Sequence, residues 1–267
     1  MGGAIDEKKV RKTWPRFFIQ PRRVQTRDGQ LSATMDKDLV HYLRTVLRIG
    51  VNQKIILFDG SGREYLAQIV ESRPAHVQAK IIETRSPRTE SKLEITLGQA
   101  LLKEQAFDKV LTSATELGVS KIIPVLSKRV VAKINPAEAH KKIYRWEKII
   151  QEAAAQSARV SIPKIEYPVP IDQLLQQNAD AQKIILWEKA PGGEIKSPEI
   201  MREFFSKNKI RILIGPEGGF EDDEVEKALQ AGFITLGLGP RILRAETAPT
   251  AALAILQYLF GDLATSS

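Results

Sequence analysis

Cysteine is absent from the 267-residue sequence, which therefore has neither disulfide bonds nor a thiolate metal site. The three histidines, His41, His76 and His140, lie far apart, and none has a neighbour at the spacing of a metal-ligand motif, which argues against a metal enzyme. No apolar run approaches the roughly 20 residues that a membrane-spanning helix needs. The first 14 residues carry both charge signs without an apolar segment, unlike a secretory signal, so we expect a cytoplasmic protein without a membrane partner.

The net charge of +8 is unevenly distributed along the chain. Residues 1–89 contain 17 lysines and arginines against 9 aspartates and glutamates, whereas residues 90–267 contain 23 of each kind. The plain interpretation is a soluble basic surface, and the functional one is a module that docks on a polyanion. Basic residues lie among Trp14, Phe17 and Phe18, which suits RNA better than a membrane because bases stack on aromatic rings. The predicted phosphate contacts are Arg16, Arg22, Arg23 and Arg27.

The first third of the chain has the pattern of a small β-rich unit with one helix. Two apolar runs around the DGSG turn at 55–70 predict a hairpin, and HVQAKII at 76–82 predicts a further strand. Apolar residues at helical spacing predict a helix within 36–50, which Gly50 ends. The polar segment that follows contains a proline and is typical of a linker.

After residue 92 the pattern changes to an alternation of strands and helices. Strands separated by helices indicate a parallel sheet covered on both faces, which is an α/β fold. Strands are predicted at 93–100, 121–126, 183–188, 211–215 and 233–239, and helices at 104–118 and 140–158.

Three glycine-containing segments follow successive predicted strands: WEKAPGG at 187–193, GPEGGF at 215–220 and LGLGPR at 236–241. Each alone is consistent with a plain tight turn, but ligands of open α/β sheets bind at the carboxyl ends of strands, so together they predict a shared pocket. The chain has neither a G-x-x-x-x-G-K-[ST] loop nor a G-x-G-x-x-G turn after its first predicted parallel strand. Acidic residues at 217 and 221–224 would repel a pyrophosphate, so we predict a neutral or cationic ligand, such as an adenosyl group with a sulfonium.

An apolar helix follows the last glycine-containing turn. Thr247 is expected to cap this helix, and Pro249 suits its first turn. The run AALAILQYLF at 251–260 is apolar nearly all round, which predicts that the helix is buried.

The loop ahead of this helix carries Arg241, Arg244 and Glu246. A loop attached to a buried helix is held rigidly, as a catalytic site requires, so these three residues are the predicted catalytic group. The alternative is that the arginines pair with Glu217 or Glu246 and only brace the loop.

The blocks GPEGGFEDDEV at 215–225 and LGLGPRILRAETAPTAAL at 236–253 resemble the 16S ribosomal RNA uridine-N3 methyltransferases (RsmE type) of the SPOUT superfamily. The resemblance extends over nearly the whole chain. The chain departs from the family at Ala155 and Ala158, which stand where the family has Glu and Gly, and at 103–107, where KEQAF replaces a Lys-Gly-rich turn. Further blocks of the same kind are RFFI at 16–19, HYLRTVLRIG at 41–50, LFDGSGREYLAQI at 57–69, ATELGVSKIIPV at 114–125 and AAAQSARVSIP at 153–163.

The resemblance implies a PUA-like β-barrel for RNA docking at 16–85, a linker at 86–92 and a SPOUT methyltransferase domain with a trefoil knot and a parallel sheet at 93–267. Residues 1–15 are then an extension. It also implies a homodimer, S-adenosylmethionine (SAM) as the cofactor, and a uridine of 16S rRNA within the small ribosomal subunit as the substrate. The cofactor-binding residues expected on this basis are Leu186, Glu188, Ile214, Gly215, Glu217, Gly218, Gly219, Leu238, Gly239, Ile242, Leu243 and Thr247.

The chemistry sets the expected roles. The N3 proton of uracil must leave before methyl transfer, which calls for a base and for cationic donors that stabilise charge on O2 and O4. Arg244 or Arg241 is expected to supply the donors, and Glu246 either acts as the base or orients Arg244. Two rival functions are a non-catalytic RNA-binding or ribosome-assembly factor, and a SPOUT methyltransferase that acts on another base or on the ribose.

Overall fold

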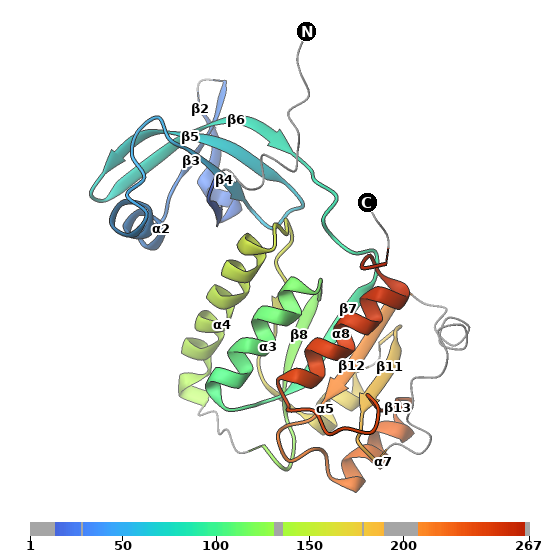
Figure 1. Ribbon diagram of the computed structural model, residues 1–267. Helices are drawn as coiled ribbons and strands as arrows, with labels where there is room; N and C mark the ends of the chain where they lie inside the picture. Colours follow the sequence, from blue (N-terminus) through green and yellow to red (C-terminus); the bar gives the residue numbers. More distant parts are fainter. Residues whose placement is uncertain (1–13, 28, 131–135, 178, 190–207, 265–267) are drawn as a thin grey trace. The chain divides into compact units, whose positions relative to one another are not determined.

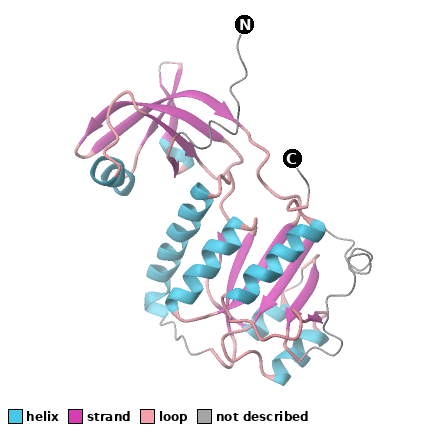
Figure 2. Ribbon diagram, viewed as in Figure 1, coloured by secondary structure: helices cyan, strands magenta, loops and turns pink. Residues whose placement is uncertain are grey.

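The computed structural model describes residues 14–27, 29–130, 136–177, 179–189 and 208–264, and in it the chain divides into two units (Figures 1 and 2). The first unit contains the residues up to Glu90 together with Ala154–Ile162, and the second contains Ser91–Ala153 and the residues from Pro163 onwards. The boundary after Glu90 falls within the expected linker 86–92. The return of the chain to the first unit at Ala154–Ile162 was not predicted.

A six-stranded sheet in the order β1-β4-β5-β6-β3-β2 forms the first unit. The DGSG turn joins β4 to β5 as the predicted hairpin, because Phe58 pairs antiparallel with Glu64. The order begins at β1 and ends at β2, so closure into the expected barrel stays a prediction. The strands are β1 (Arg16–Phe18), β2 (Val24–Arg27), β3 (Gln30–Thr34), β4 (Lys54–Phe58), β5 (Glu64–Arg73) and β6 (His76–Arg85).

The helix predicted within 36–50 begins where expected and then changes its winding. Asp36 caps α2 (Lys37–His41), because its side chain accepts a hydrogen bond of 2.9 Å from the amide of Leu39. The chain continues as a π-helical turn, Tyr42–Val46. Such turns are rare and occur frequently at functional sites, so this segment is a candidate for contact with a ligand.

One ion pair and one hydrogen bond from a side chain attach the returning segment Ala154–Ile162 to the rest of the first unit. Arg16 on β1 pairs with Glu64 on β5, and their side chains are only 6% and 7% exposed. Arg16 also donates a hydrogen bond of 3.0 Å to the carbonyl oxygen of Arg159, whose guanidinium in turn pairs with Glu90 at 2.7 Å. The segment is thus held by side chains that lie far from it in the sequence.

The backbone of the returning segment makes further bonds to the first unit. The amides of Val160 and Ser161 donate to one carboxylate oxygen of Glu90, at 3.0 and 3.1 Å. Ala158 has a φ of 61°, in the left-handed region that favours glycine. The chain therefore holds an alanine in a glycine-like conformation at the position where the resembling family has glycine.

The second unit contains a sheet in which all strand pairs are parallel, as predicted, in the order β10-β8-β7-β12-β11-β13, with β9 beside β8. Apolar runs without alternation form the central strands because both faces of a parallel sheet are covered. The strands are β7 (Glu94–Ala100), β8 (Lys121–Leu126), β9 (Lys164–Ile165), β10 (Val169–Pro170), β11 (Gln182–Leu186), β12 (Lys209–Ile214) and β13 (Ile234–Leu236).

The helices lie on both faces of this sheet (Figure 1). On one face α3 and α8 lie side by side, and on the other α5 packs against α7. Two predictions needed adjustment: β13 ends at Leu236, before the glycines, and the short α5 was not foreseen. The helices are α3 (Glu104–Glu116), α4 (Pro136–Gln156), α5 (Ile171–Gln176), α7 (Asp222–Gln230) and α8 (Thr247–Phe260).

The last helix, α8, differs from its prediction in two respects. Its N-cap is Glu246, and no side chain caps it, so the expected cap by Thr247 is wrong. The helix is also not buried all round, because Leu253 and Leu256 are fully buried whereas Tyr258 is 59% exposed. An apolar sequence does not distinguish a face buried within this chain from a face that the chain leaves open.

Polar bonds fix α8 against α3 despite its apolar sequence. The buried side chain of Gln257 accepts a hydrogen bond of 2.8 Å from Ser91 and donates one of 2.9 Å to the carbonyl oxygen of Leu117. One turn from the start of α8, Thr250 donates to Ser113 at 2.9 Å. The loop that precedes α8 is therefore attached to a firmly anchored helix, as the sequence predicted.

Candidate functional site

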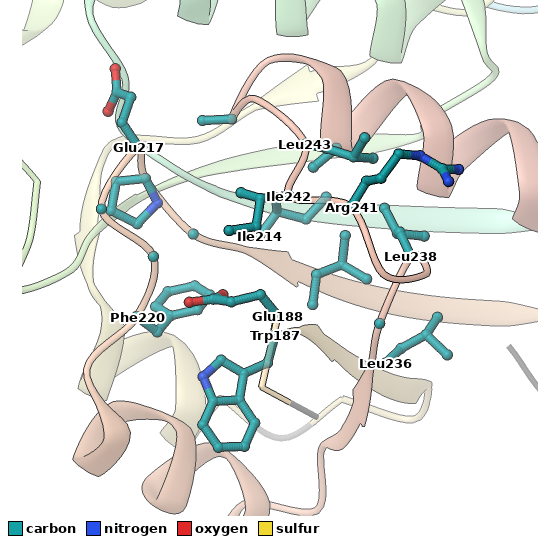
Figure 3. Close-up of a pocket in the computed structure, with 18 of the residues that line it drawn as sticks. Trp187, Glu188, Ile214, Glu217, Phe220, Leu236, Leu238, Arg241, Ile242 and Leu243 are labelled. Carbon is teal, nitrogen blue, oxygen red and sulfur yellow. The ribbon is translucent and has the colours of Figure 1, made fainter. Parts of the chain in front are cut away.

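A pocket lies at the carboxyl ends of β11, β12 and β13, which are neighbours in the sheet (Figure 3). Its cavity volume is about 290 Å³. Segments 186–188, 214–220 and 236–248 supply its lining residues, so the three predicted loops meet in one place, except that residues 190–193 of the first lie outside the described residues. This location is the usual ligand site of an open α/β sheet.

Nearly all of the predicted cofactor-binding residues line this pocket. The exception is Thr247, the first residue of α8, although Ala245 and Ala248 on either side of it do line the pocket. Pattern reasoning missed residues that lie between predicted ones, and adjacency along the chain was the only signal for them. The predicted residues in the lining are Leu186, Glu188, Ile214, Gly215, Glu217, Gly218, Gly219, Leu238, Gly239, Ile242 and Leu243. The missed residues are Trp187, Pro216, Phe220, Leu236, Gly237, Ala245 and Ala248.

The apolar part of the lining combines buried and open side chains. Ile214 and Phe220 are 2% exposed, whereas Ile242 is 88% exposed. Trp187 contributes an indole Nε1 that is shielded from solvent and has no hydrogen-bond partner among the described residues. A buried donor without a partner is costly, so this atom is a candidate contact for a bound polar group.

The GPEGGF loop at 215–220 turns tightly along the pocket. Gly219 has a φ of 70°, and its amide donates a hydrogen bond of 2.9 Å to the carbonyl oxygen of Pro216. A Cβ atom on Gly215 would lie 3.3 Å from the backbone carbonyl carbon of Gly219 and from the ring of Phe220. Glycine is therefore favoured at both positions, at Gly219 by the positive φ and at Gly215 by the close approach of the loop.

The acidic residues at the start of α7 are neutralised, which corrects the electrostatic argument from the sequence. Glu221 and Glu224 form a capping box. Lys128 pairs with Asp223 at 2.5 Å, and its hydrogen bond holds the pKa of Asp223 below the usual value. Arg129 pairs with Glu221 at 2.8 Å. Repulsion of a pyrophosphate by this cluster is therefore weaker than predicted.

Two carboxylates in the pocket lining make no ion pair within the described ranges. They belong to Glu188 and Glu217, and among the residues that the structure describes the only hydrogen bond to either is a long one of 3.3 Å from the amide of Lys103 to Glu217. Figure 3 shows Glu188 beside Phe220 and Glu217 near the other end of the GPEGGF loop. Two negative charges without ion-pair partners favour a cationic ligand. The prediction of a cationic ligand therefore stands, but it now rests on Glu188 and Glu217 rather than on the acidic start of α7.

The three predicted catalytic residues are not equivalent in the structure. Arg241 lines the pocket and is exposed, with its side chain extending towards α8 (Figure 3). Arg244 and Glu246 do not line the pocket, and the carbonyl oxygen of Arg244 accepts bonds from the first amides of α8. The alternative in which the arginines pair with Glu217 or Glu246 is not found, since neither forms an ion pair in the described part of the chain.

The four arginines predicted to contact RNA are also unequal. Arg16 is buried in the ion pair with Glu64, so its proposed phosphate contact is wrong. Arg23 is half-buried and donates to the carbonyl oxygen of Met35, whereas Arg22 is exposed. Arg27 ends β2, and its side chain lies outside what the structure describes. The burial of Arg16 could not be predicted from local pattern, because its partner Glu64 lies 48 residues away.

Within the described ranges, no group of three or more His, Asp or Glu side chains could hold a metal ion. No helix among the same residues is long and apolar enough to cross a membrane.

Comparison with known proteins adds the following. Residues 89–257 match the model of an RNA methyltransferase domain family, and residues 36–82 match that of an RNA methyltransferase PUA domain. The chain is 34% identical to the ribosomal RNA small subunit methyltransferase E of Synechocystis sp. over 91% of this chain and 77% of that protein. It is 31% identical to the protein of the same name from Bacillus subtilis, over 91% of this chain and 96% of that one.

Solved structures show the same likeness. A ribosomal RNA small subunit methyltransferase E from Neisseria gonorrhoeae, bound to SAM, has a TM-score of 0.80 and 32% identity, covering 94% of this chain and 99% of its own. A methyltransferase from Legionella pneumophila in complex with SAM has a TM-score of 0.80 and 30% identity at the same coverage.

Proposed function

Because the chain belongs to the family of RNA methyltransferases that includes the ribosomal RNA small subunit methyltransferase E proteins, we propose that it transfers a methyl group from SAM to N3 of a uridine in 16S rRNA. The observation that carries this proposal is the convergence of three loops, each predicted to bind the cofactor, on one pocket at the carboxyl ends of adjacent parallel strands. The reaction takes place on the small ribosomal subunit in the cytoplasm.

The residues of the pocket fit an adenosyl sulfonium. Apolar side chains such as Ile214 and Phe220 suit the purine ring, and the unpartnered indole Nε1 of Trp187 suits a hydrogen-bond acceptor on the ligand. The carboxylates of Glu188 and Glu217 suit its positive charges. When bound, SAM supplies an electrophilic methyl group on sulfur.

The protein residues have the remaining tasks. The backbone of the glycine loops holds the cofactor. Arg241 donates hydrogen bonds to the uracil oxygens, on which negative charge collects once the N3 proton has passed to solvent water. Arg244 and Glu246, which lie outside the pocket lining, position the loop at the start of α8. This assignment selects Arg241 from the two arginines that the sequence left as alternatives.

The proposed RNA-docking surface consists of the exposed residues of segment 42–51. Tyr42, Val46, Leu47 and Val51 are 45%, 57%, 39% and 50% exposed, which is unusual for apolar side chains so close together in a chain. The ring of Tyr42 lies edge-on to Phe17, with 6.1 Å between the ring centroids, so it is held in place while half of it is open. Arg44 and Arg48 make no ion pair in the described part, and fixed rings beside free cations suit single-stranded RNA.

Replacing Arg48 by alanine is expected to weaken binding of a 16S rRNA fragment and to reduce the slope of log K against log salt by about one, because one phosphate contact is lost. Tyr42→Ala is expected to weaken binding with an unchanged slope, because stacking carries no charge. Filter binding at several salt concentrations measures both. Lys80→Ala, which removes an exposed charge on β6, is the control. Wild-type affinity and slope in Arg48→Ala would place the RNA elsewhere on the protein.

Two further properties of the family are proposed for this chain. β13 lies at the edge of the sheet, yet α8 packs on α3, so the chain between them must cross the ends of β11 and β12, which supports the proposal of a trefoil knot. The open apolar face of α8, where Tyr258 is 59% exposed, supports a homodimer. A crystal structure that traces residues 190–246 continuously tests the knot, and sedimentation equilibrium tests the dimer.

Methyl transfer to purified small ribosomal subunits that lack the modification tests the proposed function. With labelled SAM, the expected result is incorporation that reaches one methyl group per subunit, and mass spectrometry of the digested RNA is expected to show N3-methyluridine. Binding to the subunit without incorporation would instead establish an assembly factor. A different methylated nucleoside would establish the rival methyltransferase activity.

A further inference from the structure

The loop that follows β8 packs against the GPEGGF loop of the pocket. Its residues Lys128 and Arg129 lie 89 or more positions earlier in the chain than the residues they contact. The amide of Lys128 donates a hydrogen bond of 2.8 Å to Glu224. Arg129 donates from Nε to Glu221 at 2.8 Å and from Nη1 to the carbonyl oxygen of Gly218 at 2.6 Å. One guanidinium thus joins the start of α7 to the backbone of the loop.

The two central glycines of the loop each leave room for a neighbouring side chain. A Cβ atom on Gly218 would lie 3.3 Å from Cδ and 3.4 Å from Cβ of Arg129. A Cβ atom on Gly219 would lie 3.1 Å from a carboxylate oxygen of Glu188. The side chains of Arg129 and Glu188 therefore contact the loop where other residues would carry their own side chains.

The charges of Arg129 and Glu188, the two side chains that contact the glycines, also interact. The hydrogen bond to Glu221 raises the pKa of the Arg129 guanidinium, and the negative charges of Asp222 and Glu188 raise it further. Arg129 lies outside the pocket lining, whereas Glu188 and Gly218 lie within it. The guanidinium is therefore placed to act on the pocket through the loop, without contact with the ligand.

We propose that Arg129 is a positioning residue that holds the GPEGGF loop in the conformation that binds the methyl donor. A loop with three glycines samples many backbone conformations, and ordering it on binding costs affinity. A guanidinium that fixes the Gly218 carbonyl reduces this cost before the cofactor arrives. The proposal rests on the proposed function, in which this pocket binds SAM.

Calorimetry with S-adenosylhomocysteine tests the proposal on the full-length protein. Arg129→Ala is expected to raise Kd about tenfold, since a hydrogen bond from a charged donor is lost. Arg129→Lys keeps the charge but not the fork that reaches two acceptors, so an intermediate Kd is expected. The control is Lys227→Ala, which removes an ion pair between α7 and Asp172 of α5 at similar exposure but does not touch the loop. In kinetics, KM for SAM is expected to rise with kcat within about twofold of wild type, as for lost ground-state binding.

A Kd within twofold of wild type in Arg129→Ala would overturn the proposal, as would an equal rise in Lys227→Ala. Should the alanine variant fold poorly, as judged by its melting temperature, the same criterion applies to Arg129→Lys. Hydrogen exchange in the absence of ligand is a second measurement: the Gly219 amide is expected to exchange faster in Arg129→Ala, and an unchanged rate would also overturn the proposal. If wild-type protein binds no S-adenosylhomocysteine, the proposed function fails, and hydrogen exchange alone then decides on Arg129.

Discussion

Replacing Arg241 by alanine is expected to lower kcat for methyl transfer by about 10²- to 10³-fold, the usual cost of losing a donor that stabilises transition-state charge. Arg241 is exposed in the pocket lining, and no ion pair within the described residues commits its guanidinium. Once the N3 proton has left, the uracil carries negative charge on O2 and O4, and a nearby guanidinium lowers the energy of that state. Because the cofactor contacts proposed above are chiefly to loop backbone, Kd for SAM is expected to change little.

Arg244→Ala separates this role from bracing of the loop. Arg244 lies outside the pocket lining, so its replacement is expected to lower kcat much less than that of Arg241. Single-turnover kinetics with small ribosomal subunits measures both, and the melting temperature confirms folding. A larger fall in kcat for Arg244→Ala than for Arg241→Ala would reverse the assignment. Arg241→Lys is expected to recover only part of the rate, because an ammonium cannot offer two parallel donors to the uracil.

The second large effect concerns stability. Arg16→Ala is expected to lower the free energy of unfolding by about 3–5 kcal/mol, because it leaves the buried carboxylate of Glu64 without its partner. The two side chains are 6% and 7% exposed, so water does not replace the lost guanidinium. The variant also loses the bond to the carbonyl oxygen of Arg159, which weakens the attachment of segment 154–162. Urea unfolding followed by circular dichroism measures the change.

Two comparisons make the stability prediction specific. Arg73→Ala removes an ion pair with Glu71 in which the Arg73 side chain is 75% exposed, so a loss of only about 0–1 kcal/mol is expected. The double variant Arg16→Met with Glu64→Leu removes both buried charges and is expected to be more stable than Arg16→Ala. A loss below about 1 kcal/mol in Arg16→Ala would show that the pair contributes no more than a surface one.

Local patterns were sufficient to predict the parts of this protein that depend on local order. The strands from Glu94 to Ala100 and from Lys209 to Ile214 were found because continuous apolar runs form the centre of a parallel sheet. The pocket was found because glycine turns at the ends of neighbouring strands necessarily lie at one edge. Because the strands are parallel, turns that are separate in the sequence come together in one site.

The errors concern contacts between distant parts of the chain. Arg16 was predicted to contact RNA because its neighbours in sequence are basic and aromatic. In the structure it pairs instead with Glu64, which lies 48 residues away. The acidic start of α7 was predicted to repel a pyrophosphate. Local pattern could not show that Arg129, which lies 92 residues earlier, pairs with Glu221. Charge patterns in a sequence give the number of charges, but the fold decides which of them pair. The prediction that α8 is buried all round failed for a similar reason, since an apolar sequence does not show which of its faces another part of the chain covers.

The return of the chain to the first unit at Ala154–Ile162 has a consequence for synthesis on the ribosome. Domains at the N-terminus commonly fold while the remainder is still being made. Here Arg16 bonds to the backbone of Arg159, and Glu90 pairs with its side chain. The first unit therefore cannot reach its final form until the ribosome has released more than half of the chain. A nascent chain stalled shortly after Glu90 is therefore expected to remain sensitive to protease, whereas one stalled well beyond Ile162 gains protection.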